Sequence, residues 1–373
     1  MNHYLTEYDN KKYLKPIWKG ESVFAETAFV LKNALGFIPE IRLAYPIKKV
    51  ISVTSFDFKT IYEEGKDYRV NKNGELEIIE GGKIPFLKWE DYRFNEFVEN
   101  GHQIASADAI GSYILGELFC DHDGISQWTI AVSYTHEENK AYDLAKDKSE
   151  KLVSFLNKLK TQKSATVVSY GDSITYGWGA SGMKDVNKPP YCKPYANMTV
   201  EYLQDRFNAE IKHENFSVSG MCTDWAEKDE NVQKVIDACP DLVIFAFGMN
   251  DAGGFHPNEF YQKAVNIITK VRKVHKNVPF VIVSPIMPNP LVAFTAGSSI
   301  CRYHAEYPRV FETIERDLEN IAYVNVTQMH NRLLERKTLQ DTLSNNVNHP
   351  NDFMHRVYAQ TVLKTILGED FDL

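Results

Sequence analysis

The sequence contains few cysteines and no long hydrophobic run, and each absence excludes a class of protein. Its five cysteines are odd in number, widely scattered and without C-x-x-C spacing, so neither a disulfide framework nor a zinc cage is expected. No apolar stretch approaches about 18 residues, and no signal-peptide pattern is visible, so no membrane span or export signal is expected. We therefore predict a cytoplasmic protein with free thiols.

An excess of positive charge is absent as well. The formal net charge of −8 argues against nucleic acid or an anionic membrane as the main partner. No H-E-x-x-H motif or other recognised spacing of metal ligands occurs, so no metal or other cofactor is expected. The chain has 373 residues, of which 43% are hydrophobic and 25% are charged. This length and composition are typical of an ordinary globular protein of about two domains.

The hydrophobic pattern changes near residues 140–163. Residues 1–140 contain short strand-like runs, including a predicted hairpin around Asn73-Gly74, which indicates a mostly β, sandwich-like N-terminal domain. Residues 141–163 place leucines at helical spacing among many lysines and predict a linker helix.

Residues 164–373 alternate between strand and helix patterns. Five strands separated by helices predict a parallel sheet that is covered by helices on both faces. The predicted strands are residues 165–170, 211–218, 241–247, 278–284 and 321–326.

Several polar residues follow these predicted strands, at the edge where open α/β sheets bind ligands. The first strand ends in Asp172-Ser173, which makes Ser173 the candidate nucleophile, with Asp172 expected to brace the turn. A serine hydroxyl needs a nearby imidazole to take its proton, and His349 lies before the last predicted helix. The backbone N–H groups of Ser173 and Gly220 and the amide of Asn250 can donate hydrogen bonds to an oxyanion.

These four segments, in this order, resemble the SGNH hydrolases, also called GDSL-type esterases. The resemblance covers about residues 164–370 and implies that Ser173 is the nucleophile and His349 the base, with Gly220 and Asn250 in the oxyanion hole. It also implies a flavodoxin-like three-layer α/β/α fold, which agrees with the strand pattern.

The chain departs from the family at the third member of the catalytic triad. The family usually has an aspartate three residues before the histidine, and Asn346 stands there in this chain. A backbone carbonyl, Asp341 or Asp352 remains as the group that orients His349, and Asp352 is the better of the two carboxylates. His355 is a rival base, expected to point away from the sheet edge if His349 points toward it.

The long loop after the fourth predicted strand is expected to shape the substrate pocket. Aromatic residues near the site offer stacking faces for a sugar ring, although packing is an equally good role for each of them. The candidate pocket residues are Trp178, Trp225, Asn289, Phe294 and Tyr303.

The function that this pattern favours is a serine ester hydrolase acting on a small acylated substrate. The resemblance, taken with the N-terminal β module, implies removal of short acyl groups, above all O-acetyl, from a carbohydrate; this is an association, because a fold does not determine a substrate. A lipase, lysophospholipase or thioesterase is the alternative among enzymes. A catalytically silent carbohydrate-binding protein is the alternative that Asn346 favours.

Overall fold

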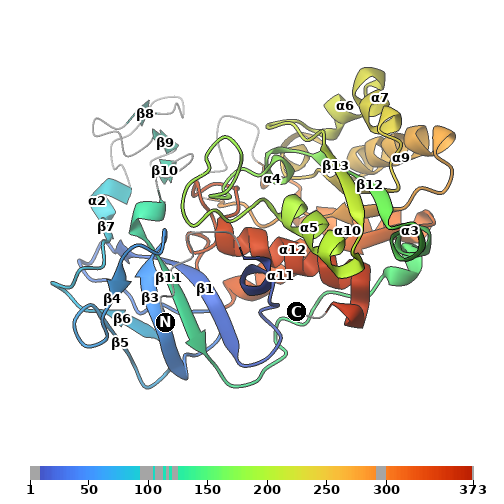
Figure 1. The fold of residues 1–373 in the computed structure, drawn as a ribbon. Helices are drawn as coiled ribbons and strands as arrows, with labels where there is room; N and C mark the ends of the chain where they lie inside the picture. The colour runs from blue at the N-terminus through green and yellow to red at the C-terminus, as the bar shows by residue number, and fades with distance from the viewer. Residues whose placement is uncertain are drawn as a thin grey trace.

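A computed structural model describes residues 9–92, 104–105, 112–114, 117–119, 125–290 and 300–371. Its main feature is a five-stranded sheet in which every neighbouring pair is parallel, as predicted (Figure 1). The central strands are almost wholly apolar because helices cover both of their faces. In spatial order the strands are β13 (Glu210–Asn215), β12 (Ser164–Gly171), β14 (Leu242–Ala246), β15 (Phe280–Val283) and β16 (Ile321–Val324).

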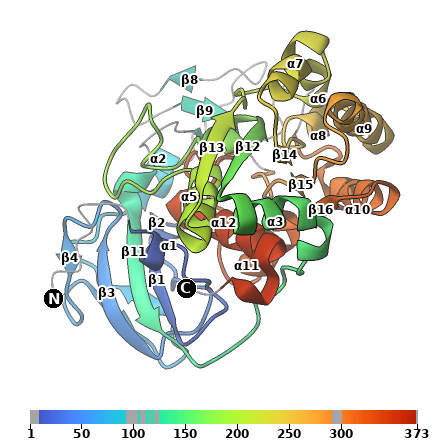
Figure 2. The ribbon, with the colours of Figure 1, turned by 45° about the vertical axis from the view of Figure 1, so that its right-hand side comes forward.

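Helices form a layer on each face of this sheet, and alternate residues of each strand point to opposite layers (Figures 1 and 2). One layer comprises α3 (Val153–Gln162), α5 (Tyr195–Phe207), α11 (Val326–Leu334) and α12 (Asp352–Leu367). The other comprises α6 (Thr223–Ala226), α7 (Asp229–Asp237), α9 (Pro257–Val274) and α10 (Tyr307–Asp317). The short helix α4 (Ser173–Tyr176) begins two residues after the end of β12, and the short helix α8 (Asp251–Gly254) begins five residues after the end of β14.

The region before residue 140, here called the N-terminal module, is mainly β, as predicted. Its largest sheet is antiparallel, in the order β1 (Ser22–Phe29), β11 (Thr129–Thr135), β3 (Lys49–Ser55) and β4 (Ile61–Tyr62). The predicted hairpin is confirmed as β5 (Tyr68–Val70) and β6 (Leu76–Ile78), with Gly74 at a φ of +72° in the turn. The remaining described elements are α1 (Asn10–Tyr13), β2 (Leu31–Lys32), β7 (Leu87–Lys88), α2 (Trp89–Tyr92), β8 (Ile104–Ala105), β9 (Ser112–Ile114), β10 (Glu117–Phe119) and the 3-10 helix η2 (Ser126–Trp128).

The helix predicted over residues 141–163 is shorter than expected. After a single 3-10 turn, Ser149–Lys151, the helix α3 begins only at Val153. Polar groups of the preceding segment bond to other elements: the Tyr142 hydroxyl donates to Ala44 O at 2.8 Å, and Lys148 N donates to Thr365 O at 2.9 Å. These tertiary contacts override the helical spacing of the leucines.

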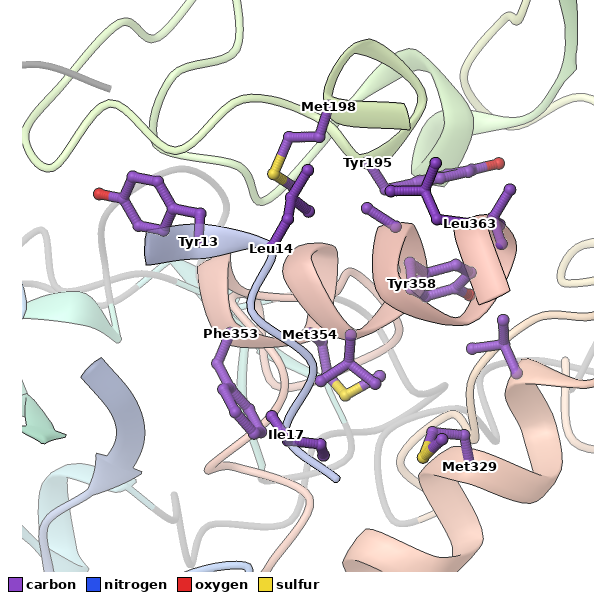
Figure 3. Close-up of a cluster of buried hydrophobic side chains, with 14 of the residues drawn as sticks. Tyr13, Leu14, Ile17, Tyr195, Met198, Met329, Phe353, Met354, Tyr358 and Leu363 are labelled. Atoms are coloured by element: carbon purple, nitrogen blue, oxygen red, sulfur yellow. The ribbon is translucent and has the colours of Figure 1, made fainter. Parts of the chain in front are cut away.

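Helix α12 lies between the N-terminal module and the parallel sheet, and all of its residues are buried (Figure 1). Tyr13, Leu14 and Ile17 of the N-terminal module belong to the same hydrophobic cluster as Phe353 and Met354 of this helix (Figure 3). The hydrophobic core therefore runs without interruption from the N-terminal module into the module that carries the parallel sheet, here called the α/β module.

Candidate active site

Ser173 lies at the carboxyl end of β12, as the first residue of the one-turn helix α4. The preceding Asp172 caps this turn, because its carboxylate accepts a hydrogen bond from Ile174 N at 3.0 Å. Burial raises the pKa of Asp172 to about 7. The carboxyl group thus has the bracing contact expected from the sequence.

His349 faces Ser173 across the carboxyl edge of the sheet. The Nε2 atom of His349 lies 3.0 Å from the Oγ atom of Ser173, within hydrogen-bond distance. A serine and an imidazole at this distance can exchange a proton. Residues that are 176 positions apart in the sequence therefore form a possible nucleophile–base pair.

Asn345 organises the loop that carries His349, and sequence reasoning missed it. Its buried side-chain oxygen accepts hydrogen bonds from the backbone N–H groups of Val347, Asn348 and His349, at 2.9, 3.0 and 3.0 Å. Asparagine side chains commonly close turns on their own backbone, so the run Asn345-Asn346-Val347-Asn348 was an available signal.

Asn346, at the position where the family usually has aspartate, is also buried in this loop. Its φ of +62° is left-handed, which asparagine tolerates better than most residues. Its side-chain oxygen accepts from Tyr92 Oη at 3.3 Å and from Asn289 Nδ2 at 3.2 Å. Asn289 Nδ2 also donates to Asn346 O at 2.9 Å, so this predicted pocket residue is buried and contacts the histidine loop.

The candidate oxyanion donors follow three adjacent strands, β13, β12 and β14. Gly220 has a φ of +75° and open space where a Cβ would lie, so its backbone faces no side chain there. Asn250 Nδ2 donates to Met221 O at 3.1 Å, which places the amide beside the Gly220 turn and leaves its second N–H group for another acceptor. Asp251 links the two loops, because its carboxylate accepts from Thr223 N and Gly248 N.

The rival base, His355, is buried with both ring nitrogens engaged. Tyr195 N donates to its Nδ1 at 3.3 Å, and its Nε2 donates to Trp178 O at 3.0 Å. Burial lowers the pKa of His355 to about 4, which favours the neutral ring. These contacts give His355 a structural role in holding the segment after Ser173.

Both candidate orienting carboxylates bond to groups other than His349. Asp352 accepts from Ser181 N and Ser181 Oγ, each at 2.7 Å, one bond to each carboxylate oxygen. Asp341 accepts from Phe29 N at 2.8 Å through one oxygen and from Thr338 N at 2.7 Å through the other. All four oxygens therefore stabilise loops and the module interface.

The candidate aromatic residues lie in different places. The Trp178 ring lies 6.0 Å from the His349 ring, tilted by 25°, and its Nε1 donates to Ser219 Oγ at 2.6 Å. Trp225 packs near Tyr170, and Tyr303 contacts the ring of His256. Phe294 lies outside the described residues. The structure therefore places Trp178 against the Ser173–His349 pair.

Within the described residues, no group of three or more His, Cys, Asp or Glu side chains is arranged to hold a metal ion. Among the helices of that same part of the chain, none combines the length and the hydropathy that crossing a membrane requires.

Three solved structures illustrate what the chain is similar to. Axe2, an acetylxylan esterase from Geobacillus stearothermophilus, is 19% identical, with a TM-score of 0.43 over 54% of this chain and 94% of that one. CEX, a two-domain esterase active on acetylated mannans, is 18% identical, with a TM-score of 0.44 over 60% and 55%. LAE5, a hydrolase from the metagenome of Lake Arreo, Spain, is 20% identical, with a TM-score of 0.40 over 53% and 93%. At such low similarity these structures carry no argument about the substrate.

Comparison of the sequence with curated proteins gives no match. Comparison with models of protein families does give one. Residues 169–357, which include Ser173, Gly220, Asn250 and His349, match the GDSL-like lipase/acylhydrolase family over half of the chain. The protein therefore belongs to the GDSL-like lipase/acylhydrolase family and is a carboxylic ester hydrolase.

Proposed function

We propose that the protein hydrolyses short acyl esters with Ser173 as nucleophile and His349 as general base. The observation that carries this proposal is the 3.0 Å distance between Ser173 Oγ and His349 Nε2. Ser173 Oγ attacks the acyl carbonyl while its proton passes to His349 Nε2. His349 then gives this proton to the leaving alcohol, and water, activated by the same imidazole, releases the acyl group.

The oxyanion of the tetrahedral intermediate would be held by the N–H groups of Ser173 and Gly220 and by Asn250 Nδ2. Removing one such donor typically costs about 10²–10³ in kcat. The hydrogen bond from Asn250 Nδ2 to Met221 O supports this role, because it fixes the amide beside the Gly220 turn. Asn250→Ala should therefore lower kcat far more than it changes KM.

We infer that neither Asp341 nor Asp352 is the third member of the catalytic unit. Asp341 and Asp352 are both bonded to other groups, and Asn345 holds the backbone of His349 itself. Losing the aspartate of a complete triad costs about 10⁴ in kcat. We expect Asp341→Asn and Asp352→Asn to cost much less than that in the folded protein.

For the substrate we propose an O-acetyl group on a carbohydrate. The Trp178 ring, stacked near the His349 ring, is an apolar surface beside the reacting atoms, and the Ser219 hydroxyl accepts a hydrogen bond from its Nε1. Such a combination of a flat apolar face and hydrogen-bonding groups suits a sugar ring. Activity should then fall steeply from acetyl to octanoyl esters, whereas equal rates would favour a lipase.

The test compares three variants on p-nitrophenyl acetate. Ser173→Ala and His349→Ala should each lose at least about 10⁴-fold in kcat, as removal of a nucleophile or its base does in other serine hydrolases. His355→Ala should keep substantial activity wherever it remains folded. A fluorophosphonate should label Ser173 alone. Full activity of Ser173→Ala, or loss only in His355→Ala, would refute the assignment.

A further inference from the structure

A cavity of about 470 Å³ lies between the N-terminal module and the α/β module. Its volume falls in the range of roughly 300–1,000 Å³ that is typical of small-molecule sites. Among the described residues, its lining comes from residues 55–62, Pro85 and residues 125–129 of the N-terminal module, and from residues 179–189 and 343–351 of the α/β module. Neither module forms this cavity alone.

One part of the cavity wall is formed by residues that flank the loop carrying His349. Ser344, which lines the cavity, donates from its backbone N to His349 O at 2.9 Å and from its Oγ to the same oxygen at 3.3 Å. Gly179, on the same wall, leaves no room for a side chain, because a Cβ would lie 2.0 Å from Pro350 O. Gly179 also follows Trp178 directly in the chain. Two lining residues, Ser344 and Gly179, are therefore joined to His349 by a hydrogen bond and to Trp178 by a peptide bond.

The lining combines apolar faces with polar groups of both signs. Phe56 and Tyr62 contribute aromatic rings, and Ser126 and Gln127 contribute polar side chains. Lys59 Nζ lies 3.1 Å from Asp57 Oδ2, so these two charges partly balance each other, and Lys188 adds another positive charge to the lining. A neutral sugar matches this chemistry, because its C–H faces pack on aromatic rings and its hydroxyl groups reach polar side chains.

We propose that this cavity is a second subsite, which binds sugar residues of the saccharide that are remote from the ester. This inference rests on the proposed function, because it assumes that Ser173 cleaves an acyl group from a saccharide. Binding of the remote sugars would hold the acyl group at Ser173 and raise kcat/KM for oligosaccharides. A small ester that reaches only Ser173 would gain nothing from it.

The test uses two variants of the full chain. Phe56→Ala removes an aromatic ring from the cavity lining, and Ser126→Trp fills the cavity with a large side chain. The substrates are partially acetylated xylo- and manno-oligosaccharides and p-nitrophenyl acetate. We expect kcat/KM on the oligosaccharides to fall about tenfold or more in both variants, chiefly through KM. On p-nitrophenyl acetate both variants should stay within about twofold of the unmodified protein.

A matched control is Tyr261→Ala, which removes an aromatic ring from a separate surface hollow between α9 and α10. It should change neither substrate's kinetics, and thermal melts should show that all three variants fold. The Ser173→Ala variant should bind non-acetylated oligosaccharides when it is titrated with them. The double variant, which also carries Phe56→Ala, should bind them more weakly.

Three results would overturn the subsite. The first is unchanged oligosaccharide kinetics in both cavity variants. The second is a parallel loss on both substrates, which would mean that the cavity wall only shapes the catalytic pair. The third is an unmodified protein that cleaves p-nitrophenyl acetate but none of the oligosaccharides. The third result would overturn the proposed carbohydrate substrate as well. Failure of the proposed ester hydrolysis is distinct from all three, since the unmodified protein would then leave p-nitrophenyl acetate intact.

Discussion

The side chain of Asn345 holds the backbone of the loop that carries His349. Its oxygen accepts hydrogen bonds from three backbone N–H groups of the loop. These bonds fix the backbone of His349 rather than its ring. An error of about 1 Å in the position of a reacting group can cost about 10² in rate. Asn345 is therefore a positioning residue in the proposed mechanism.

Replacing Asn345 tests this role. Asn345→Ala removes the acceptor and should lower kcat on p-nitrophenyl acetate by about 10–10², with KM nearly unchanged. Asn345→Asp keeps an oxygen in the same place and should restore much of the loss. If aspartate and alanine give equal kinetics, or if only KM changes, Asn345 does not position the base.

Asp172 is a buried carboxyl group whose pKa is raised to about 7 by burial, from an ordinary value of 3.8. The folded state therefore binds this proton more tightly than the unfolded state does. Between about pH 4 and pH 7 this group makes the free energy of unfolding decrease as pH rises, and the cost is fully present above pH 7.

Asp172→Asn should remove this pH-dependent cost. Asparagine caps a helix about as well as aspartate and carries no charge. The variant should melt at least about 2 °C higher than the unmodified protein at pH 8, with a difference that shrinks toward pH 4. Calorimetric melts over this range measure it. A difference independent of pH would mean that ionisation of Asp172 is not the cause.

Helix α12 is the element that joins the two modules. Its Arg356 donates hydrogen bonds to Phe24 O and Ala25 O of β1, at 2.9 and 3.0 Å. A second polar connection lies close by in the chain: Lys337 and Glu26, both fully buried, form an ion pair at 2.7 Å. Buried charges of this kind specify how two surfaces meet, because each is costly without its partner.

The Lys337–Glu26 pair predicts strong coupling between two substitutions. Lys337→Met and Glu26→Gln should each lower the free energy of unfolding by about 3–5 kcal/mol, because each leaves a buried polar or charged partner uncompensated. The double variant should lose much less than the sum of the two. Urea unfolding of the four proteins measures this coupling, and simple additivity would show that the pair does not act as a unit.

At the scale of the whole molecule, the continuous core makes the N-terminal module part of one folding unit. Side chains of Tyr13, Leu14 and Ile17 cover α12, which is buried along its entire length. Removing them exposes a large apolar surface to water, at a cost of about 25 cal/mol for each Å² of apolar area.

A shortened chain that starts near residue 149, and so keeps α3, should therefore fail to fold. We expect it to aggregate or to bind a hydrophobic dye, without a cooperative melt. The measurement is a thermal melt followed by circular dichroism, with the full chain as control. A soluble fragment that melts cooperatively and hydrolyses p-nitrophenyl acetate at the full rate would show that the α/β module is self-sufficient.

Much of the fold was predictable because the elements concerned are governed by local pattern. The five strands of the sheet, the central ones apolar, and the hairpin at Gly74 follow from residue type and spacing alone. The linker helix was predicted too long, because bonds from Tyr142 and Lys148 to distant backbone groups hold its first part in another conformation. Local spacing carries no information on such bonds.

By itself, the sequence determined the alternation of strands and helices and the positions of Ser173, Gly220, Asn250 and His349 after predicted strands. Only the tertiary structure decided which histidine faces Ser173, that Asp341 and Asp352 bond elsewhere, and that Asn345 holds the loop. The reason is physical. Strand and helix patterns reflect interactions between near neighbours in the chain, whereas the distance between Ser173 and His349 depends on how all the intervening elements pack.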